Sequence, residues 1–229
     1  MYGYRKIHTD LLALGEQCGK HRVLRLMQSA QIQSERGYKR KATYPGGDPA
    51  TVAPNLLNRQ FEVAAPNQVW VTDITYIRTS EGWLFLAVVM DLHTRKILGV
   101  ALGPRLSQGL TLGALEMALR EGCPEVHHSD RGVQYTSRAY VERLLGLGVR
   151  LSYAGTGRPW ENGHAERLIR TIKEEWVALR EYRTLAEARA SVKAFVLEVY
   201  NRKRPHSALG YLTPEAFSES LLKGGGSPD

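Results

Sequence analysis

The chain has 229 residues, long enough to bury a full-sized core in one main domain with smaller parts on either side. Hydrophobic residues make up 43% of the chain and charged residues 24%, which excludes a disordered or fibrous protein. The 31 Lys and Arg outnumber the 23 Asp and Glu, and the formal net charge of +8 favours a polyanionic partner such as nucleic acid.

Two short helical patterns occupy the chain from Arg5 to about Ala30, with Gly15 and Gly19 between them. Two short helices around a Gly-containing turn predict a helix-turn-helix-like DNA-binding segment over residues 1–35, although any small helical hairpin has the same pattern. Its candidate DNA contacts are Arg22 and Arg25. Residues 36–66 are rich in Lys, Arg, Gly and Pro without a sustained period, which predicts a basic linker.

From residue 67 onward the pattern alternates between strands and helices. Runs of β-branched, aromatic and other apolar residues predict consecutive strands at 69–77, 83–90 and 96–102. Ser107 is placed to cap the helix that follows. The later predicted elements are a strand at 125–129, a helix at 137–147, a strand at 149–153, a loop at 154–161 and long helices at about 163–179 and 184–200.

This order predicts an α/β protein. Three strands in succession can form an antiparallel meander, and the strands joined through helices can add to it in parallel. The expected architecture is a ribonuclease-H-like mixed five-stranded sheet flanked by helices, preceded by a small helical segment. We expect the core to span residues 67–217 and a disordered, Gly-rich tail to span 218–229.

The two cysteines, Cys18 and Cys123, lie far apart without a zinc or disulfide motif, which fits a reducing cytosol. The first residues lack the apolar core of a signal peptide, and no apolar run approaches the roughly 18 residues that a membrane helix needs. The sequence therefore predicts a cytoplasmic protein without a membrane partner.

Three acidic residues stand at positions where chemistry is plausible. Asp73 lies in the middle of an apolar strand, where a charged carboxylate is costly unless it is paired or bound to metal. Asp130 closes a short strand, at a place where α/β sheets often carry functional groups. Glu166 lies one turn into a helix. Each also has an ordinary explanation: an edge or turn residue, a turn cap, and a first-turn Glu that complements the helix dipole.

The combination of the three is more specific than any one of them. Two carboxylates on adjacent strands and a third on a covering helix, with 35 residues between Asp130 and Glu166, can converge on one point. Such a triad can hold two divalent ions, and oxygen ligands suit Mg²⁺ or Mn²⁺ better than zinc. Arg170 and Lys173 share a helix face with Glu166 and can reach a bound phosphate, although an ordinary ion-pair face looks the same. Arg131 is a further candidate DNA contact.

Four segments carry a resemblance to a known family: APNQVWVTDITY at 65–76, HSDRGVQY at 128–135, NGHAER at 162–167 and YNRKRPHSALGY at 200–211. Together they resemble the integrase-core transposases of bacterial insertion sequences, which are relatives of retroviral integrase. The resemblance runs from Tyr2 to about Phe217. It implies that Asp73, Asp130 and Glu166 form the catalytic, metal-binding triad, and it matches Lys173 to the family's basic residue seven positions after its Glu.

The resemblance also implies a reaction and partners. The expected reaction is cleavage at transposon ends, which exposes a 3′-hydroxyl, followed by attack of that hydroxyl on target DNA. The expected partners are double-stranded DNA at both the transposon ends and the target, further copies of the chain on DNA, and a helix-turn-helix protein from an upstream reading frame.

Two departures from the family qualify this expectation. Family chains usually hold residues upstream of Tyr2, so the helix-turn-helix-like segment is expected to be truncated at its start, and Glu161 stands where many members have Asp. The alternative function is a truncated, non-catalytic DNA-binding fragment of such a transposase. A cellular nuclease of the same fold is disfavoured because the Asn201–Tyr211 segment belongs with the transposases.

Overall fold

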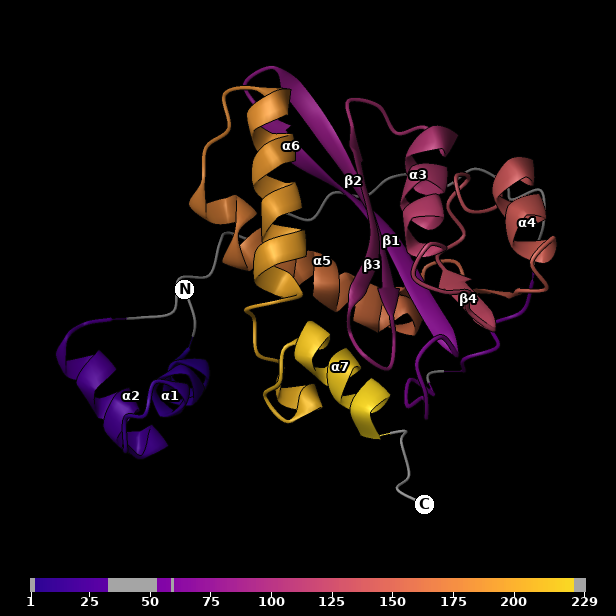
Figure 1. Cartoon of the computed structure of the whole chain (residues 1–229). Helices are drawn as coiled ribbons and strands as arrows, with labels where there is room; N and C mark the ends of the chain where they lie inside the picture. Colours follow the sequence, from indigo (N-terminus) through magenta and orange to yellow (C-terminus); the bar gives the residue numbers. More distant parts are fainter. Residues whose placement is uncertain (1–2, 33–52, 59, 225–229) are drawn as a thin grey trace.

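A computed structural model describes residues 3–32, 53–58 and 60–224 (Figure 1). Its centre is a five-stranded sheet with the order β3-β2-β1-β4-β5. The strands are β1 (Val69–Thr79), β2 (Gly82–Asp91), β3 (Ile97–Gly103), β4 (Val126–Ser129) and β5 (Arg150–Tyr153). The α-helices are α1 (Tyr4–Ala13), α2 (Lys20–Ser29), α3 (Gln108–Ala118), α4 (Arg138–Leu145), α5 (Gly163–Glu175), α6 (Leu185–Ala194) and α7 (Pro214–Gly224).

The sheet is mixed, as the order of the predicted elements indicated. Strands β1, β2 and β3 form an antiparallel meander, and β4 and β5 add to it in parallel beyond β1. Helix α3 makes the crossover from β3 to β4, and α4 makes the crossover from β4 to β5. The predicted mixed five-stranded sheet flanked by helices is therefore confirmed.

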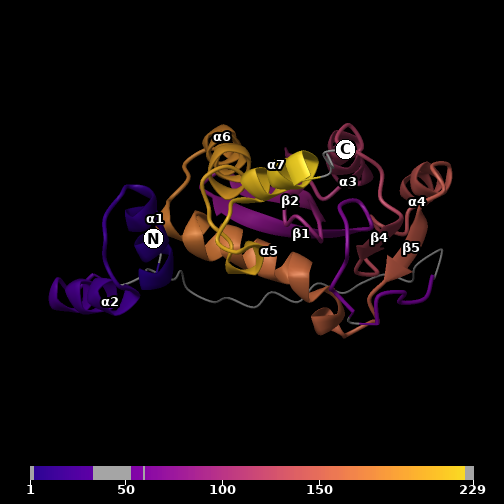
Figure 2. The ribbon, with the colours of Figure 1, turned by 60° about the horizontal axis from the view of Figure 1, so that its bottom comes forward.

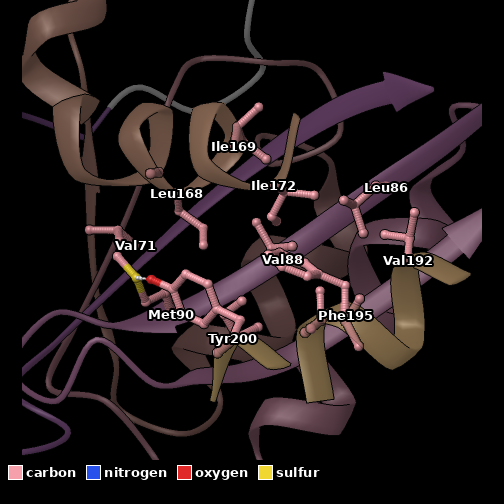
Figure 3. Close-up of a cluster of buried hydrophobic side chains, with 14 of the residues drawn as sticks. Val71, Leu86, Val88, Met90, Leu168, Ile169, Ile172, Val192, Phe195 and Tyr200 are labelled. Atoms are coloured by element: carbon pink, nitrogen blue, oxygen red, sulfur yellow. Dashed lines mark hydrogen bonds between the residues drawn. The ribbon is translucent and has the colours of Figure 1, made fainter. Parts of the chain in front are cut away.

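Each face of the sheet has its own hydrophobic cluster because side chains alternate along a strand. On one face, Leu86 and Val88 of β2 pack with Leu168 and Ile172 of α5 and with residues of α6, as Figure 3 shows. On the other face, Trp70 and Ala87 pack with α3 and α4. Asp73 is two residues from Val71 on β1, so the alternation directs it to the face that α5 covers.

Helices α1 and α2 lie at one end of the molecule, opposite the end that carries α4, in both views (Figure 2). They contact each other, and Val23 and Met27 of α2 are buried in this small unit. Helix α5 extends toward them, and Lys6 of α1 lies 3.5 Å from Glu175 at its end. None of the helices in the described ranges is both long enough and apolar enough to cross a lipid bilayer.

Three predicted helices differ in detail from those observed. Ser107 precedes α3, but its hydroxyl makes no capping hydrogen bond. The helix predicted at 163–179 ends at Glu175, because Trp176 leaves the helical conformation and stacks on Phe195 at 4.9 Å between ring centroids. The helix predicted at 184–200 becomes a π-helix at Phe195–Tyr200. A π-helix aligns residues five apart, so Phe195 and Tyr200 both face the core.

The loop predicted at 154–161 and the tail predicted at 218–229 also contain regular structure. A 3₁₀ helix, η1 (Pro159–Asn162), leads directly into α5. Residues 218–224 are helical rather than disordered, because α7 docks on the core through Phe217, which lies against His93, and through the Glu215 N–H, which donates to the Asn201 carbonyl. The end of the predicted tail and most of the predicted linker lie outside the described residues.

Candidate functional site

The sheet register brings two of the predicted acids together. Val71 of β1 pairs with His128 of β4 in parallel, and continuing this register by two residues would set Asp73 beside Asp130. Asp73 is half-buried, and one of its carboxylate oxygens accepts a 2.7 Å hydrogen bond from the Ile74 N–H. Asp130 follows the last residue of β4, and its carboxylate accepts a 2.9 Å bond from the Gly132 N–H.

Helix α5 carries the third acid to the same region. Its apolar side, Ala165, Leu168, Ile169 and Ile172, is buried against the sheet, which leaves Glu166 at the edge of this contact. The start of the helix is attached to β1, because the Asn162 Nδ2 donates to the Thr72 carbonyl at 3.1 Å. Asn162 lies one turn before Glu166, and Thr72 directly precedes Asp73. This bond therefore fixes the third acid relative to the first.

Asp73 lies within electrostatic reach of the other two acids. The pKa of Asp73 is raised to about 8, first by burial and then by the charges of Asp130 and Glu166, while the Ile74 N–H and Lys173 act in the opposite direction. Asp130 is exposed as a whole residue, but crowding of its carboxyl by protein atoms raises its pKa, against the Gly132 hydrogen bond. A bound cation would reduce the repulsion among these carboxylates and so stabilise their charged forms.

The donor chemistry of the triad fits a hard divalent cation, because carboxylate oxygens are the preferred ligands of Mg²⁺. The Asn162 Oδ1, one helical turn before Glu166, is also buried, and it has no hydrogen-bond partner among the described residues. In the part of the chain that the structure describes, however, no three His, Cys, Asp or Glu side chains already stand in a metal-binding arrangement. Asp73 and Asp130 each use one carboxylate oxygen to accept a backbone N–H bond, and the other oxygen of each makes no observed hydrogen bond among the described residues.

The predicted DNA contacts on α5 lie on two sides of that helix. The ammonium of Lys173 lies 4.7 Å from the centre of the Tyr76 ring on β1, a cation–π distance, and within electrostatic reach of Asp73. Burial lowers the pKa of Lys173, against the Asp73 charge, which raises it. Arg170 is exposed and lines a large cleft on the other side of α5. Because Arg170 and Lys173 are three residues apart on α5, they are neighbours on the helix surface, and Arg170 lies at the border between the side of Lys173 and the cleft.

The remaining predicted DNA contacts lie apart from α5. Arg131 follows Asp130 and is half-buried, and its Nε is buried without a hydrogen-bond partner among the described residues. Arg22 and Arg25 are exposed on α2, at the end of the molecule away from the acids. None of the three is brought to the triad by an observed hydrogen bond or ion pair.

Glu161 organises the loop before α5. Its carboxylate accepts hydrogen bonds from the Gly155 N–H (2.7 Å), the Asn55 side chain (2.8 Å) and Arg158 (3.3 Å). The Gly155 bond is the largest cause of its lowered pKa, opposed by burial. Glu161, which stands where many members of the family have Asp, therefore receives hydrogen bonds from Gly155, Asn55 and Arg158 at this position.

A second network joins the same loop to the sheet, and sequence reasoning missed it. The His128 Nε2 lies 3.0 Å from the Glu161 carbonyl, so this nitrogen carries the proton, and the Nδ1 accepts from Ser152 Oγ at 2.8 Å. Ser152 Oγ in turn accepts from the Leu56 N–H at 2.9 Å. Burial keeps His128 neutral by lowering its pKa to about 4. No periodic signal in residues 53–58 indicated this attachment.

Comparison with known proteins agrees with this geometry. Residues 63–159 and 147–214 match two family models described as integrase core domain, and residues 1–41 match an HTH-like domain. The chain is 38% identical over 221 residues to the insertion element IS600 uncharacterized 31 kDa protein of Shigella sonnei, covering 95% of this chain and 81% of that protein. It is 34% identical over 224 residues to the transposase InsF for insertion sequence IS3A of Escherichia coli K12, covering 96% and 78%.

The fold is also found among solved structures. The catalytic core domain of HTLV-2 integrase, solved in complex with magnesium, superposes with a TM-score of 0.53 at 18% identity and covers 66% of this chain and 96% of that one. The fold and the matched family models define a protein with an integrase core. At the level of sequence, the chain belongs to the transposases of bacterial insertion sequences, and it fits the second-frame catalytic subunit of the IS3 type.

Proposed function

We propose that this transposase is a polynucleotidyl transferase that cleaves DNA at transposon ends and joins those ends to target DNA. Asp73, Asp130 and Glu166 would hold two Mg²⁺ or Mn²⁺ ions. The observation that carries the proposal is the electrostatic coupling of Asp73 to Asp130 and Glu166 from three different elements. When bound, such a metal pair supplies activation of the attacking oxygen and stabilisation of the leaving oxygen in an in-line displacement.

The reaction is two successive displacements at phosphorus. In the first, a water oxygen replaces the 3′ oxygen at the transposon end, and that oxygen leaves as a 3′-hydroxyl. In the second, this 3′ oxygen attacks a target phosphate and releases a target 3′-hydroxyl. The number of phosphodiester bonds is conserved in the second step, so it needs no external energy source.

The protein's own groups would position the DNA and the acids. Asn162 holds the start of α5 to β1 and so keeps Glu166 near Asp73. Lys173, whose ammonium lies over the Tyr76 ring, would contact the phosphate beside the scissile bond. The ordered loop around Glu161 would keep this geometry from relaxing when DNA binds.

The substrate inferred from the chemistry is double-stranded DNA, which would place the work of the protein in the bacterial cytoplasm. Joining both ends of an element needs two sites, so we infer that several copies assemble on DNA, with an upstream-frame helix-turn-helix protein as a further partner. Light scattering of the chain with and without end DNA measures the first of these assemblies, and co-purification measures the second.

The test uses a duplex that carries the end of the protein's own element. Asp73→Asn, Asp130→Asn and Glu166→Gln should each abolish nicking and joining in Mg²⁺, while DNA binding is retained or strengthened because negative charge is removed. Glu219→Gln, an exposed acid on α7, is the control and should keep full activity. Near-normal strand transfer in any one of the three variants would overturn the assignment.

The same assay separates the two candidate functions. The second candidate is a truncated, non-catalytic DNA-binding fragment of such a transposase, and the match of residues 1–41 to an HTH-like domain also fits it. If the parent protein binds end DNA but neither nicks nor joins it in Mg²⁺ or Mn²⁺, that second function holds and the polynucleotidyl transferase proposal fails.

A further inference from the structure

A cleft of about 850 Å³ runs along the side of α5 away from Lys173. Four separate parts of the chain line it: the start of α1, Met90 and Arg95 at and just after the end of β2, one side of α5, and the segment from Tyr200 to Ala208. The last of these belongs to the family motif at 200–211, for which the proposed chemistry has no use. The cleft is therefore a candidate for a function distinct from catalysis.

The lining of the cleft is strongly basic. It contains six Lys and Arg residues and two glutamates. One of the glutamates, Glu175, is already engaged: Arg204 donates to both of its carboxylate oxygens at 2.6 Å, and Lys6 lies 3.5 Å away. The remaining basic residues are Arg5, Arg95, Arg167 and Arg170.

Three of these arginines lack an acidic partner. Arg95, Arg167 and Arg170 form no salt bridge within residues 3–32, 53–58 and 60–224. Arg95 is half-buried, and among the described residues the one hydrogen bond of its guanidinium goes to the His164 Nδ1 at 2.6 Å, which must be unprotonated to accept. Burial lowers the pKa of Arg95 even though the charge of Asp91 acts on this guanidinium without forming a salt bridge, so an anion bound in the cleft would stabilise its charge.

The backbone also holds Arg95 in place. Arg95 adopts a left-handed conformation with φ of 59°, which is uncommon outside glycine. The turn is fixed by Asp91, whose carboxylate accepts from the backbone N–H groups of His93 and Thr94. Such strain persists where surrounding contacts determine it, and here it directs a cation into the cleft.

The opposite wall of the cleft, formed by the segment at 200–211, is also held by hydrogen bonds to the rest of the fold. The Asn201 side chain accepts from the Ile97 N–H and donates to the Ile97 carbonyl, both at 2.9 Å, which ties the segment to the start of β3. Arg204 is only 8% exposed and bonds both to Glu175 and to His206. The motif at 200–211 therefore builds a rigid wall that faces α5.

The titration behaviour of the lining agrees with a surplus of positive charge. Burial, with Arg95 and Arg167, lowers the pKa of His164 to about 4. Burial, with Arg204 and Lys6, lowers the pKa of His206 to about 3. Both histidines are thus neutral beside arginines, and an anion in the cleft would relieve the repulsion among the cations.

We propose that this cleft binds the phosphate backbone of double-stranded DNA, on the side of α5 adjacent to the one that carries Glu166. The inference rests on the proposed function, because it names where the DNA substrate is held. From His164 to Glu175 the helix covers roughly 16 Å at about 1.5 Å per residue. One DNA strand carries a charge about every 3.4 Å of its axis, so the cleft spans several phosphates rather than a single small anion.

The position of Arg170 connects the cleft to the acids. It follows Glu166 by one helical turn and lies on the crest between the two sides of α5. A duplex whose backbone lies in the cleft would therefore pass Arg170 and reach the carboxylates. The motif at 200–211 would act as a positioning wall for DNA, without contact with the reacting atoms.

The test compares two pairs of exposed arginines by fluorescence anisotropy on a labelled random-sequence duplex. In the Arg167→Gln/Arg170→Gln double variant, the slope of log affinity against log salt should become shallower by about 1.8, since each phosphate contact contributes about 0.9. The Arg167→Lys/Arg170→Lys variant should restore the parent slope. The control is Arg120→Gln/Arg189→Gln, which removes the same charge from exposed arginines outside the cleft and should change the slope by less than half as much.

The outcomes are separable. If the parent binds duplex and the cleft variant keeps the parent slope, or loses no more than the control pair, the cleft is not a DNA site while the proposed function stands. If the parent binds no duplex at all, both proposals fail. Equal melting temperatures of the parent and the double variants establish that the comparison is between folded proteins.

Discussion

The two sides of α5 collect charge of opposite sign. On one side, Asp73, Asp130 and Glu166 lie together, and burial with like charge raises the pKa of Asp73 to about 8. On the other side, six basic residues surround two glutamates, and His206 is kept neutral with a pKa of about 3. Each cluster raises the free energy of the folded protein until its counterion binds. One helix thus separates a candidate cation site from a candidate polyanion site.

Glu161, in the loop before α5, is a nearby acid whose charge is stabilised by hydrogen bonds. Its carboxylate receives three hydrogen bonds, led by the Gly155 N–H, and its pKa is lowered rather than raised. Glu161 therefore needs no external ion. The contrast with Asp73 shows that an acid near a functional site is a candidate ligand only where the protein leaves it without donors or cations.

The largest predicted effect concerns the wall of the basic cleft. Although burial raises the pKa of Glu175, its bonds with Arg204 outweigh burial and lower the pKa overall. Arg204→Ala leaves this half-buried acid without its main partner, and we expect a loss of about 3 kcal/mol of unfolding free energy. Urea denaturation measures the loss.

Arg202→Ala is the matched control for this prediction, two residues away. Arg202 is exposed and pairs only with Glu198 at helical spacing, so its removal should cost less than ~0.5 kcal/mol. Equal effects of the two substitutions would show that the Arg204–Glu175 pair adds nothing to the wall.

The second prediction is a loss of stability in acid on the basic side. The folded pKa of His206, about 3, lies below the ordinary value of 6.5, so the unfolded chain binds the proton more readily. Its contribution to stability is complete above pH 6.5 and is lost as the pH falls toward 3. In His206→Gln, the fall in unfolding free energy from pH 7 to pH 5 should be smaller than in the parent by about 1 to 2 kcal/mol. An unchanged pH difference would mean that His206 is not held neutral.

The third prediction concerns the acidic side and its cation. If Mg²⁺ binds with a dissociation constant near ~1 mM, then ~10 mM Mg²⁺ should stabilise the fold by roughly 1.4 kcal/mol. The melting temperature should rise by about 3 to 6 °C. Ca²⁺ should stabilise comparably but support little chemistry, because its geometry is less strict.

Asp130→Asn is the variant that tests the origin of this shift. In EDTA it should be at least as stable as the parent, because one repelling charge is gone, and the rise with Mg²⁺ should largely disappear. Thermal melts of both proteins in EDTA, Mg²⁺ and Ca²⁺ decide the matter. The same metal-induced rise in both would place the bound ions elsewhere and remove the physical basis of the triad.

The smallest effect is expected at Lys173, the one cation on the acidic side of α5 that lies over Tyr76. If it contacts a phosphate beside the scissile bond, Lys173→Ala should weaken binding on every DNA sequence and lower the salt slope by about one unit. Parallel salt plots for variant and parent would show that Lys173 neutralises Asp73 without contacting DNA.

Much of the fold could be predicted because it depends on local patterns. The apolar runs of β1 and β2 and the amphipathic stretch of α5 were each assigned to the correct element, with ends that differ by a few residues. The order of strands and helices then restricted the sheet topology. The irregular points resisted prediction: α5 stops where Trp176 turns to stack on Phe195, a residue 19 positions later that belongs to another helix.

The sequence by itself determined the charge balance, the elements and the strand or helix on which each acid lies, because these follow from composition and from periods of two and 3.6 residues. Only the tertiary structure decided which charges meet. Arg95 reaches His164 across 69 positions, and Asn55 reaches Glu161 across 106. Such pairs depend on how turns and helices pack against the sheet. A net charge of +8 cannot indicate that basic residues without a salt bridge gather along one side of α5, adjacent to the side that carries Glu166.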